Sequence, residues 1–451
     1  MQLSESQQKA FDCYKRGENV FITGPGGCGK SELIRIIVKD AAQTHKTCNV
    51  CALTGCACIL LQCNAKTLHS WAGIGLGNGE IEKMAIDISL NKFKRKNWKN
   101  VDILIIDEVS MMSYKLFHAL NSIAKKCRSS TKYFGGIQLI FSGDFHQLAP
   151  VGDINEPDTC RYCFESELWK EIFVNQIIFD SIFRQTDQQY IKILTQIRCG
   201  KISKTTVDVL QSYVGRTYEA SSIIKPTIIS PTRAKVDAIN KREMSLITGE
   251  INTFRKERCV CDVTDKYGNI ITSDKDIFTE NEKNFEYEFL TKNITCDDTI
   301  QLKKGAQVMC IANIDMDNDI CNGSQGIVED FTVSGLPIVK FNNNITRTIS
   351  QHTWQSERIK TIGVKQIPLM LSWAITIHKS QGATLDRAEI DIGNDIFACG
   401  QTYVALSRVR SLDGLYLTSF NPSKIKLNKK VLSFYESIHE RSSKINEQLL
   451  T

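Results

Sequence analysis

The sequence predicts an α/β protein with two parallel-sheet domains, the second interrupted by a small inserted β domain. The first observation is a glycine-rich turn that follows a short apolar run at 20–22 and precedes apolar residues at helical spacing. The second is a new strand and helix pattern that begins near residue 227. The third is a series of short β-like runs and turn signals between about residues 249 and 366.

The turn in the first domain matches the pattern of a phosphate-binding loop. Gly24 and Gly29 stand at the distance of G-x-x-x-x-G-K-[ST], in which small residues let backbone N–H groups surround phosphate oxygens at a helix N-terminus. Lys30 would reach the β- and γ-phosphates, and the Ser31 hydroxyl would bind Mg²⁺. A glycine-rich surface turn is the alternative. The predicted nucleotide-binding residues are Gly24, Pro25, Gly26, Gly27, Cys28, Gly29, Lys30 and Ser31.

Length and composition indicate a folded protein of several domains. A chain of 451 residues is too long for one ordinary core, so about two to four domains are expected. The net charge of +6 permits a polyanionic partner without demanding one. No apolar run reaches membrane-spanning length, so no membrane partner is expected. The 17 cysteines are scattered and no secretory signal is recognisable, which predicts reduced thiols in an intracellular compartment, the nucleus or cytoplasm.

The first residues predict a capped helix. Ser4 is placed as the N-cap, and Gln7 stands three positions on, as in a capping box. A glutamine just upstream of a phosphate loop can also present its amide to a nucleobase edge, since the amide both accepts and donates. Spacing by itself favours the capping role.

Two further strands of the first domain end in polar groups. The apolar strand from Val101 ends in Asp107 and Glu108, where open α/β sheets place their ligands. Asp107 would hold Mg²⁺, and Glu108 would orient or deprotonate the attacking water. The strand at 137–142 leads to Gln147, a polar group that could contact the γ-phosphate.

A strand at 49–54 precedes groups suited to a nucleic-acid backbone. Thr54 is followed by Thr67, His69, Ser70 and Trp71, which supply hydroxyls, an imidazole and an indole. A buried structural histidine and a core tryptophan are equally compatible with this pattern. The basic run at 91–100, with interleaved aromatics, is typical of a solvated face, although it could also touch a nucleic-acid backbone.

The second α/β part carries arginines that could act on a bound triphosphate. Arg184 lies near its start, and Arg408 lies on a predicted helix near the end of the chain. If this part faces the triphosphate, both guanidinium groups would neutralise charge on the γ-phosphoryl group only when the cleft closes. Hydrolysis would then be coupled to domain motion. A surface salt bridge is the alternative for each arginine.

Taken together, these segments resemble the Pif family of superfamily 1 DNA helicases, relatives of the RecD-like enzymes. The resemblance rests on the generic ATPase motifs and on residues 133–151, 163–166 with Trp169, and 401–408. It implies two RecA-like motor domains and an SH3-like insertion. The implied boundaries are 1–182 for the first domain, with a small insertion at about 62–100, then 183–248 with 367–451 for the second, and 249–366 for the insertion.

The resemblance also implies roles for individual residues. Gln7 matches the family's adenine-reading glutamine, and Gly382 matches a motif near the nucleotide. The expected catalytic residues are Lys30, Asp107, Glu108, Gln147, Arg184 and Arg408, with Ser31 and Asp107 as metal ligands. The expected DNA-binding residues are Thr54, Thr67, His69, Ser70, Trp71, His378, Lys379 and Ser380.

The implied activity is that of an ATP- and Mg²⁺-dependent DNA helicase that moves 5′ to 3′ on single-stranded DNA. The expected partners are single-stranded and forked or structured DNA, and the motor is expected to be monomeric. Two departures from the family pattern, Cys28 in the phosphate loop and Ala149 in place of a usual proline, remove no catalytic group. A DNA-stimulated ATPase that only remodels nucleoprotein complexes is the alternative. A small-molecule kinase is disfavoured because it needs neither the second α/β half nor Arg408.

Overall fold

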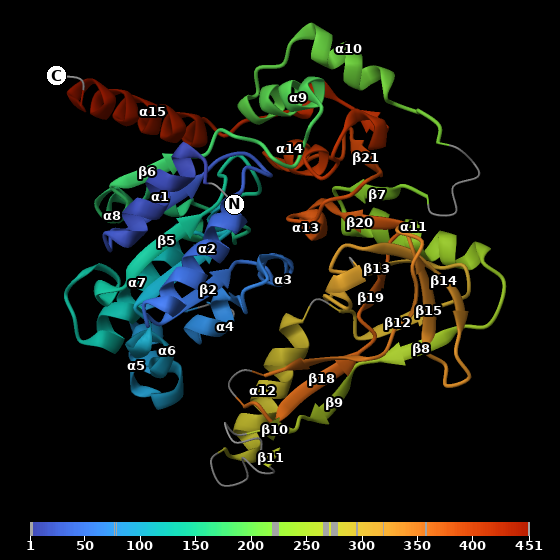
Figure 1. The fold of residues 1–451 in the computed structure, drawn as a ribbon, viewed down its shortest axis with the longest axis horizontal. Coiled ribbons are helices and arrows are strands. Elements are labelled where there is room, and N and C mark those ends of the chain that lie inside the picture. The colour runs from blue at the N-terminus through green and yellow to red at the C-terminus, as the bar shows by residue number, and fades with distance from the viewer. Residues whose placement is uncertain are drawn as a thin grey trace. The chain divides into compact units, whose positions relative to one another are not determined.

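The computed structural model describes residues 3–75, 77, 79–218, 225–264, 270–271, 278–294, 296–318, 320–356 and 359–449. The chain forms two compact units, one made of residues 1–216 and 377–451 and the other of residues 217–376 (Figure 1). Each unit is described by itself. The domain boundaries predicted above divide the chain differently and remain a prediction.

The first unit is built on a six-stranded parallel sheet. Its strands lie in the order β3-β2-β4-β5-β1-β6. They are β1 (Val20–Thr23), β2 (Cys48–Ala52), β3 (Lys66–Thr67), β4 (Ile103–Asp107), β5 (Gln138–Ser142) and β6 (Asn175–Ile178). The four strands predicted in this part are confirmed as β1, β2, β4 and β5. The short edge strands β3 and β6 were not predicted, because neither has a long apolar run.

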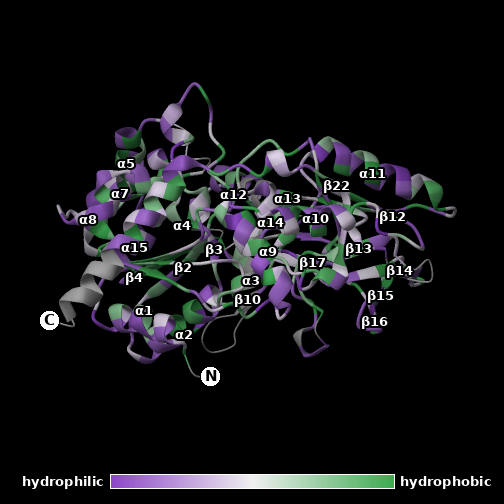
Figure 2. Cartoon of the chain, turned by 90° about the horizontal axis from the view of Figure 1, so that it is seen from above, coloured by the Kyte–Doolittle hydropathy of each residue, from purple (hydrophilic) through white to green (hydrophobic). Residues whose placement is uncertain are grey.

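Alternate residues of the central strands feed two hydrophobic cores, one on each face of the sheet. Ile103 and Ile105 of β4 belong to one core, whereas Leu104 and Ile106 belong to the other. In Figure 2 these strands are coloured mainly as hydrophobic residues. The first core contains residues of α1 (Glu5–Lys15), α2 (Lys30–Gln43) and α3 (Gly55–Leu61). The second contains residues of α4 (Leu68–Ala72), α5 (Ile81–Leu90), α6 (Lys92–Asn100), α7 (Tyr114–Arg128), α8 (Glu167–Ile172) and α15 (Lys429–Leu449).

Helices on both faces of a parallel sheet confirm the α/β prediction for this unit. The same unit also contains a parallel strand pair, β21 (Ala388–Ile392) with β22 (Leu415–Phe420). Its remaining α-helices are α9 (Gln188–Cys199), α10 (Lys204–Ser212), α13 (Ile377–Ser380) and α14 (Gln401–Leu406).

The second unit combines a small parallel element with antiparallel sheets. β7 (Thr227–Ser230) pairs in parallel with β20 (Ala374–Thr376), and α11 (Arg233–Leu246) follows β7. A five-stranded antiparallel sheet surrounds a separate hydrophobic core that contains Val308, Val328 and Val339. Its strands are β13 (Gln307–Cys310), β14 (Gln325–Phe331), β15 (Pro337–Phe341), β16 (Thr346–Thr348) and β19 (Leu369–Leu371).

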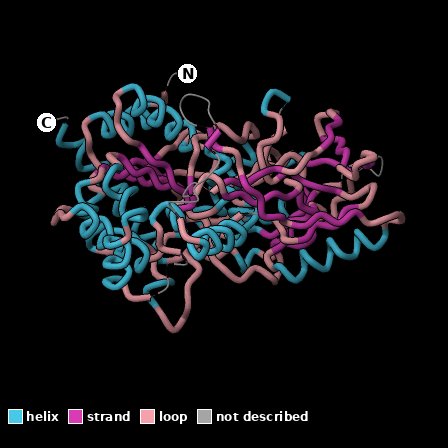
Figure 3. Tube along the Cα trace, turned by 90° about the horizontal axis from the view of Figure 1, so that it is seen from below, coloured by secondary structure: helices cyan, strands magenta, loops and turns pink. Residues whose placement is uncertain are grey.

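Three smaller antiparallel sheets complete the second unit. Figure 3 colours all strands of the chain magenta, including these. Their members are β8 (Asn252–Arg255) with β12 (Thr299–Leu302), β9 (Glu257–Val260) with β17 (His352–Gln355) and β18 (Ile362–Gln366), and β10 (Val263–Thr264) with β11 (Ile270–Ile271). The β-like runs predicted at 306–311, 326–328 and 338–341 are confirmed as β13, β14 and β15, and the run predicted at 259–263 overlaps the end of β9 and the start of β10. The helix α12 (Glu280–Asn293), which begins at a capping box of Thr279 and Glu282, was not predicted.

No helix within the described ranges combines the length and the apolar character needed to cross a lipid bilayer.

Candidate functional site

The turn between β1 and α2 is a glycine-dependent loop. Gly24, Gly27 and Gly29 have φ angles of +147°, +82° and +85°, a region that favours glycine. A Cβ at Gly24 would stand 2.5 Å from the carbonyl oxygen of Phe179, and one at Gly27 would overlap the side chain of Arg184. The loop can therefore keep this path only with glycine at these positions.

Lys30 and Ser31 form the first turn of α2, where backbone N–H groups point toward the loop. The Lys30 ammonium donates to the carbonyl oxygens of Gly24 (2.7 Å) and Pro25 (3.0 Å). Burial lowers its pKa, but the Cys28 side chain and nearby carboxylates outweigh this effect, so the pKa stays above its ordinary value. Lys30 is thus a fixed positive charge at the loop.

The end of β4 places two carboxylates beside this loop. Burial raises the pKa of Asp107. Burial and the neighbouring charge of Asp107 raise the pKa of Glu108 to about 7. Glu108 adopts left-handed backbone angles of φ 56° and ψ 38°, which are uncommon for a residue other than glycine. Its Oε2 accepts a 3.0 Å hydrogen bond from Gln381 Nε2, a residue to which sequence analysis assigned no role.

Two arginines, the buried Arg408 and the half-buried Arg184, face the same loop. A Cβ at Gly26 would lie 3.6 Å from Arg184 Nη1 and 3.7 Å from Arg408 Nη2. Burial lowers the pKa of Arg184, and burial together with the charge of Arg184 lowers the pKa of Arg408 to about 9. Arg408 donates to the carbonyl oxygen of Val404 and to Ser407 Oγ, and no described carboxylate forms an ion pair with either arginine. An anion between these groups would relieve both pKa shifts.

A cavity of about 330 Å³ brings most of the predicted nucleotide site together. Gln147 lines it, is 5% exposed, and has an Oε1 atom without a hydrogen-bond partner in the structure. The other predicted residues that line the cavity are Gly26, Gly27, Cys28, Gly29, Lys30, Ser31, Asp107, Glu108, Arg184, Gly382 and Arg408. Gly24, Pro25 and Gln7 do not line it.

Gln7 forms the predicted capping box and also lies next to the loop, whereas its role in reading adenine stays a prediction. Its Oε1 accepts from the Ser4 backbone N–H at 2.9 Å, and the reciprocal bond to Ser4 Oγ completes the predicted capping box. Its Nε2 donates to the carbonyl oxygen of Gly29 in the loop at 3.4 Å. The exposed ring of Phe183 lies near the same glycine, since a Cβ there would stand 3.3 Å from Phe183 Cε2. Sequence analysis missed Phe183, although it directly precedes Arg184.

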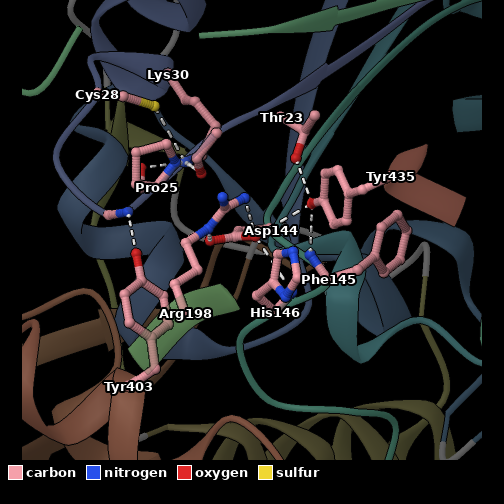
Figure 4. Close-up of polar contacts among 12 residues, drawn as sticks. Thr23, Pro25, Cys28, Lys30, Asp144, Phe145, His146, Arg198, Tyr403 and Tyr435 are labelled. Carbon is pink, nitrogen blue, oxygen red and sulfur yellow. Dashed lines mark hydrogen bonds and ion pairs between the residues drawn. The ribbon is translucent and has the colours of Figure 1, made fainter. Parts of the chain in front are cut away.

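Tyr403 also reaches the loop. The backbone N–H of Gly26 donates to the Tyr403 hydroxyl at 2.9 Å (Figure 4). Tyr403 belongs to α14, which also precedes Arg408. The stretch 401–408, which contains α14, carries part of the family resemblance, but no spacing pattern marks Tyr403 itself.

The donor set fits a nucleoside triphosphate with Mg²⁺. Lys30, Arg184 and Arg408 supply positive charge, loop N–H groups supply donors, and Asp107 with Ser31 supplies oxygen ligands. A hard cation of this kind is held by few protein oxygens and by phosphate oxygens. Within the described residues, no group of three or more His, Cys, Asp or Glu side chains could hold a metal without such help.

The predicted DNA-binding residues fall into two groups by exposure. Lys379 is exposed on α13, and His378 beside it is half-buried. Ser380 is fully buried and donates to the carbonyl oxygen of Ile377, so the prediction of a DNA-facing hydroxyl there is wrong. Thr54 Oγ1 accepts from the Ala57 backbone N–H at the start of α3.

The predicted DNA-binding residues around α4 also differ in exposure. Thr67 precedes α4 without a side-chain capping bond, and Ser70 is half-buried. His69, whose pKa is lowered by burial, lines a second cavity of about 950 Å³. Trp71 is 1% exposed, donates to Asn49 Oδ1 at 2.8 Å, and packs 4.6 Å from the Trp98 ring. Predicting Trp71 as a DNA-stacking residue is therefore wrong, because its ring belongs to the core.

Comparisons with known proteins address the whole chain. The PIF1-like helicase family model matches residues 2–208, and the model for the DNA helicase Pif1 2B domain matches residues 288–331. The ATP-dependent DNA helicase PIF1 of Homo sapiens is 33% identical over 446 residues. That alignment covers 98% of this chain, and the chain spans 65% of the human relative's length.

Solved structures agree in fold. A crystal structure of Pif1 helicase from Candida albicans superposes with a TM-score of 0.78 at 33% identity, covering 97% of this chain and 100% of that chain. A structure of Pif1 helicase from Bacteroides in complex with ADP-AlF3 and ssDNA gives a TM-score of 0.69 at 27% identity, covering 98% of each chain. The predicted α/β class is confirmed by these neighbours.

Proposed function

The chain belongs to the PIF1-like helicase family, and from this premise we propose that it is an ATP-dependent DNA helicase. It hydrolyses ATP with Mg²⁺, moves 5′ to 3′ along single-stranded DNA, and unwinds duplex or structured DNA. The Bacteroides relative named above was solved with ADP-AlF3 and ssDNA, which supports both ligand classes. The single observation that carries the proposal is the cavity that joins Lys30, Glu108, Gln147 and both arginines.

Nucleotide binding rests on the loop and on the first turn of α2. Lys30 exchanges its hydrogen bonds to the Gly24 and Pro25 carbonyl oxygens for β- and γ-phosphate oxygens. Ser31 and Asp107 would hold the magnesium ion, which would supply positive charge that shields the phosphates. The adenine lies by Gln7 and Phe183, where an amide and an exposed ring adjoin Gly29.

Glu108 is the general base of the proposed hydrolysis. It takes a proton from the attacking water as the water oxygen bonds to the γ-phosphorus and the bond to the β,γ-bridging oxygen breaks. A pKa of about 7 suits this task, because a base works best with a pKa near the operating pH. Gln381 holds the carboxylate through its 3.0 Å hydrogen bond to Oε2.

The γ-phosphoryl group is contacted by three further side chains, those of Arg184, Arg408 and Gln147. The two guanidinium groups stabilise the charge that develops as the γ-phosphoryl is transferred. Burial lowers the pKa of both groups, so a nearby negative charge is favoured. The unpartnered Gln147 Oε1 and its amide group are available to the water and the γ-phosphate. Loss of the γ-phosphoryl group would therefore break contacts to three segments that are far apart in the sequence, those that carry Gln147, Arg184 and Arg408.

DNA binding uses polar groups that do not read bases. Lys379, His378, Thr54, Thr67, His69 and Ser70 are the proposed contacts to phosphates and sugars. A motor that moves along any sequence needs such contacts, since phosphate and sugar groups carry no sequence information directly. Single-stranded and forked DNA are the proposed substrates, and the proposed active form is a monomer.

The test is ATP hydrolysis with and without single-stranded DNA, followed by unwinding of duplexes with a 5′ or a 3′ tail. DNA-stimulated hydrolysis with unwinding from the 5′ tail is expected. Unwinding from the 3′ tail would overturn the polarity. Stimulated hydrolysis with protein displacement but no unwinding of a fork would favour the nucleoprotein remodeller, and hydrolysis indifferent to DNA would overturn the proposal.

A further inference from the structure

The C-terminal helix α15 is packed into the core of the first unit. Val431, Tyr435 and Ile438 are each at most 6% exposed and belong to the same core as Trp169 of α8. Their spacing places them on one helical face. Phe434 stacks on Phe164 with ring centroids 4.3 Å apart. The helix is therefore an integral part of this unit.

The Tyr435 hydroxyl joins two segments of the proposed nucleotide site (Figure 4). It lies 2.7 Å from Thr23 Oγ1, directly before the first loop glycine. It accepts from the Phe145 backbone N–H at 3.1 Å and donates to Asp144 Oδ1 at 3.1 Å. Because its single proton goes to the carboxylate, the Thr23 hydroxyl is the donor in the remaining bond.

Asp144 is held from the other side by Arg198 of α9. The guanidinium donates from Nε to Oδ2 at 3.0 Å and from Nη2 to Oδ1 at 2.9 Å, a bidentate pair. Burial raises the pKa of Asp144, but Arg198 outweighs it and lowers the pKa to about 2. The Arg198 guanidinium also lies 5.3 Å from the centre of the Tyr435 ring. The buried carboxylate thus has a rigid, charge-compensated environment.

The same segment leads directly to Gln147. The His146 ring stacks on Tyr435 with centroids 4.5 Å apart and planes 12° apart, and the Gln147 backbone N–H donates to the Asp144 carbonyl oxygen at 2.8 Å. Residues 144–147 are therefore fixed by Tyr435 at the side chain of Asp144, at the amide of Phe145 and at the ring of His146. Through Thr23, the same hydroxyl is tied to the base of the phosphate loop.

We propose that Tyr435 is a positioning residue for ATP hydrolysis, which fixes the segment 144–147 relative to the phosphate loop and so places Gln147 opposite the γ-phosphate. The inference rests on the proposed function, since it assigns a purpose to Gln147 only if the cavity binds a triphosphate. It links α15 to hydrolysis through Tyr435 alone, a residue outside every segment that sequence analysis assigned to the hydrolytic machinery.

The test is Tyr435→Phe, which removes the hydroxyl and retains the ring. Asp144 keeps Arg198 and the His146 backbone N–H, so the fold is expected to persist. The kcat of DNA-stimulated ATP hydrolysis should fall about 10- to 100-fold, because small misplacements of a catalytic group cost this much. The KM for ATP should change less than about twofold, since the hydrogen bonds of Lys30 to the loop do not involve Tyr435.

Val431→Ala is the matched control on the same helix. Val431 is buried in the same core and takes no part in the hydrogen bonds of the Tyr435 cluster. Its replacement should lower the melting temperature at least as much as Tyr435→Phe while leaving kcat within about twofold of the parent. Thr23→Val removes only the other hydroxyl. Combined with Tyr435→Phe, it should reduce kcat by less than the product of the single effects, because the two groups share one bond.

The outcomes separate the two proposals. Parental kcat in Tyr435→Phe would overturn the inference and leave the proposed function intact. An equal loss of kcat in Val431→Ala would overturn it too, because the effect would follow stability. A parent chain without DNA-stimulated hydrolysis would overturn the proposed function, and with it the inference.

Discussion

Glu108 combines features that are costly for stability and useful for chemistry. It is half-buried next to the buried Asp107, its backbone is left-handed, and its pKa is raised to about 7. A buried carboxylate beside another one disfavours ionisation, and left-handed backbone angles at a residue other than glycine also cost free energy. Such features persist only where the surrounding structure holds them in place, here by β4 and by Gln381.

Glu108→Gln is expected to bind ATP and DNA but to lose nearly all turnover, because only the proton acceptor is removed. In the parent chain, kcat should fall as the pH drops through about 7, where Glu108 becomes protonated. The measurement is steady-state ATPase from pH 5.5 to 9 beside nucleotide-binding titrations. Normal turnover in the variant would remove Glu108 from this role.

The raised pKa of Glu108 also predicts a stability effect of known sign. The folded state binds this proton more tightly than the unfolded chain, whose glutamate titrates near pH 4.3. Its contribution is fully present below that value and is lost as the pH rises through about 7. Glu108→Gln should therefore raise the melting temperature more at pH 8 than at pH 5. An equal shift at both values would contradict the assigned titration.

Arg408→Ala should lower kcat far more than it raises KM. The charge that this guanidinium meets develops in the transition state, and arginines in comparable positions contribute about 10³- to 10⁵-fold to rate. Steady-state kinetics with saturating DNA measures both constants. Arg216→Ala is a suitable control, because its guanidinium contacts the Leu412 and Asp413 carbonyl oxygens and does not line the nucleotide cavity. Unchanged kcat with a raised KM in Arg408→Ala would indicate ground-state binding instead.

At the scale of elements, the segment around α4 combines partly exposed polar residues with a tryptophan that is part of the core. Thr67, His69 and Ser70 keep some exposure, whereas Trp71 on the same short helix anchors it to α6 through the Trp98 ring. The basic run at 91–100 is this α6, whose Trp98 is buried and donates to the Ala72 carbonyl oxygen. The aromatics in both segments thus hold the helices in place.

Trp71→Ala should destabilise the protein by about 3–5 kcal/mol, the usual cost of emptying a buried tryptophan site. Trp71→Phe should cost less, since it keeps much of the packing and mainly loses the bond to Asn49. Urea denaturation measures both values. The single-stranded DNA affinity of the folded Trp71→Phe chain should equal that of the parent. A loss of affinity without a loss of stability would restore Trp71 to the DNA path.

At the scale of the whole molecule, the proposed grip on DNA is electrostatic and independent of sequence. Lys379→Ala should weaken binding to poly-dT and to mixed-sequence oligomers alike. The log–log salt slope should become shallower by about 0.7, the value for one phosphate on a single strand. Fluorescence anisotropy across a salt series measures this. Lys429→Ala, at the start of α15 and outside the predicted set, is the control. A slope unmoved in Lys379→Ala would exclude this lysine from the strand path.

The sequence by itself determined the glycine-rich turn between β1 and α2, the strand ends at Asp107 and Glu108, the capped first helix and the α/β class. These features are local, since glycine spacing, apolar runs and capping residues act within a few positions of one another. The capping box of Ser4 and Gln7 and the strands β1, β2, β4 and β5 follow from such signals.

Only the tertiary structure decided which polar and aromatic side chains are buried and what they meet. Trp71 and Ser380 are of residue types that can contact DNA, but packing buries both side chains. Gln381, Phe183 and Tyr435 reach their partners across long stretches of chain, as the Tyr435 contact with Thr23 shows. No spacing rule encodes such contacts, because they depend on how several elements pack around one sheet, and this packing sets burial, charge and pKa at the site.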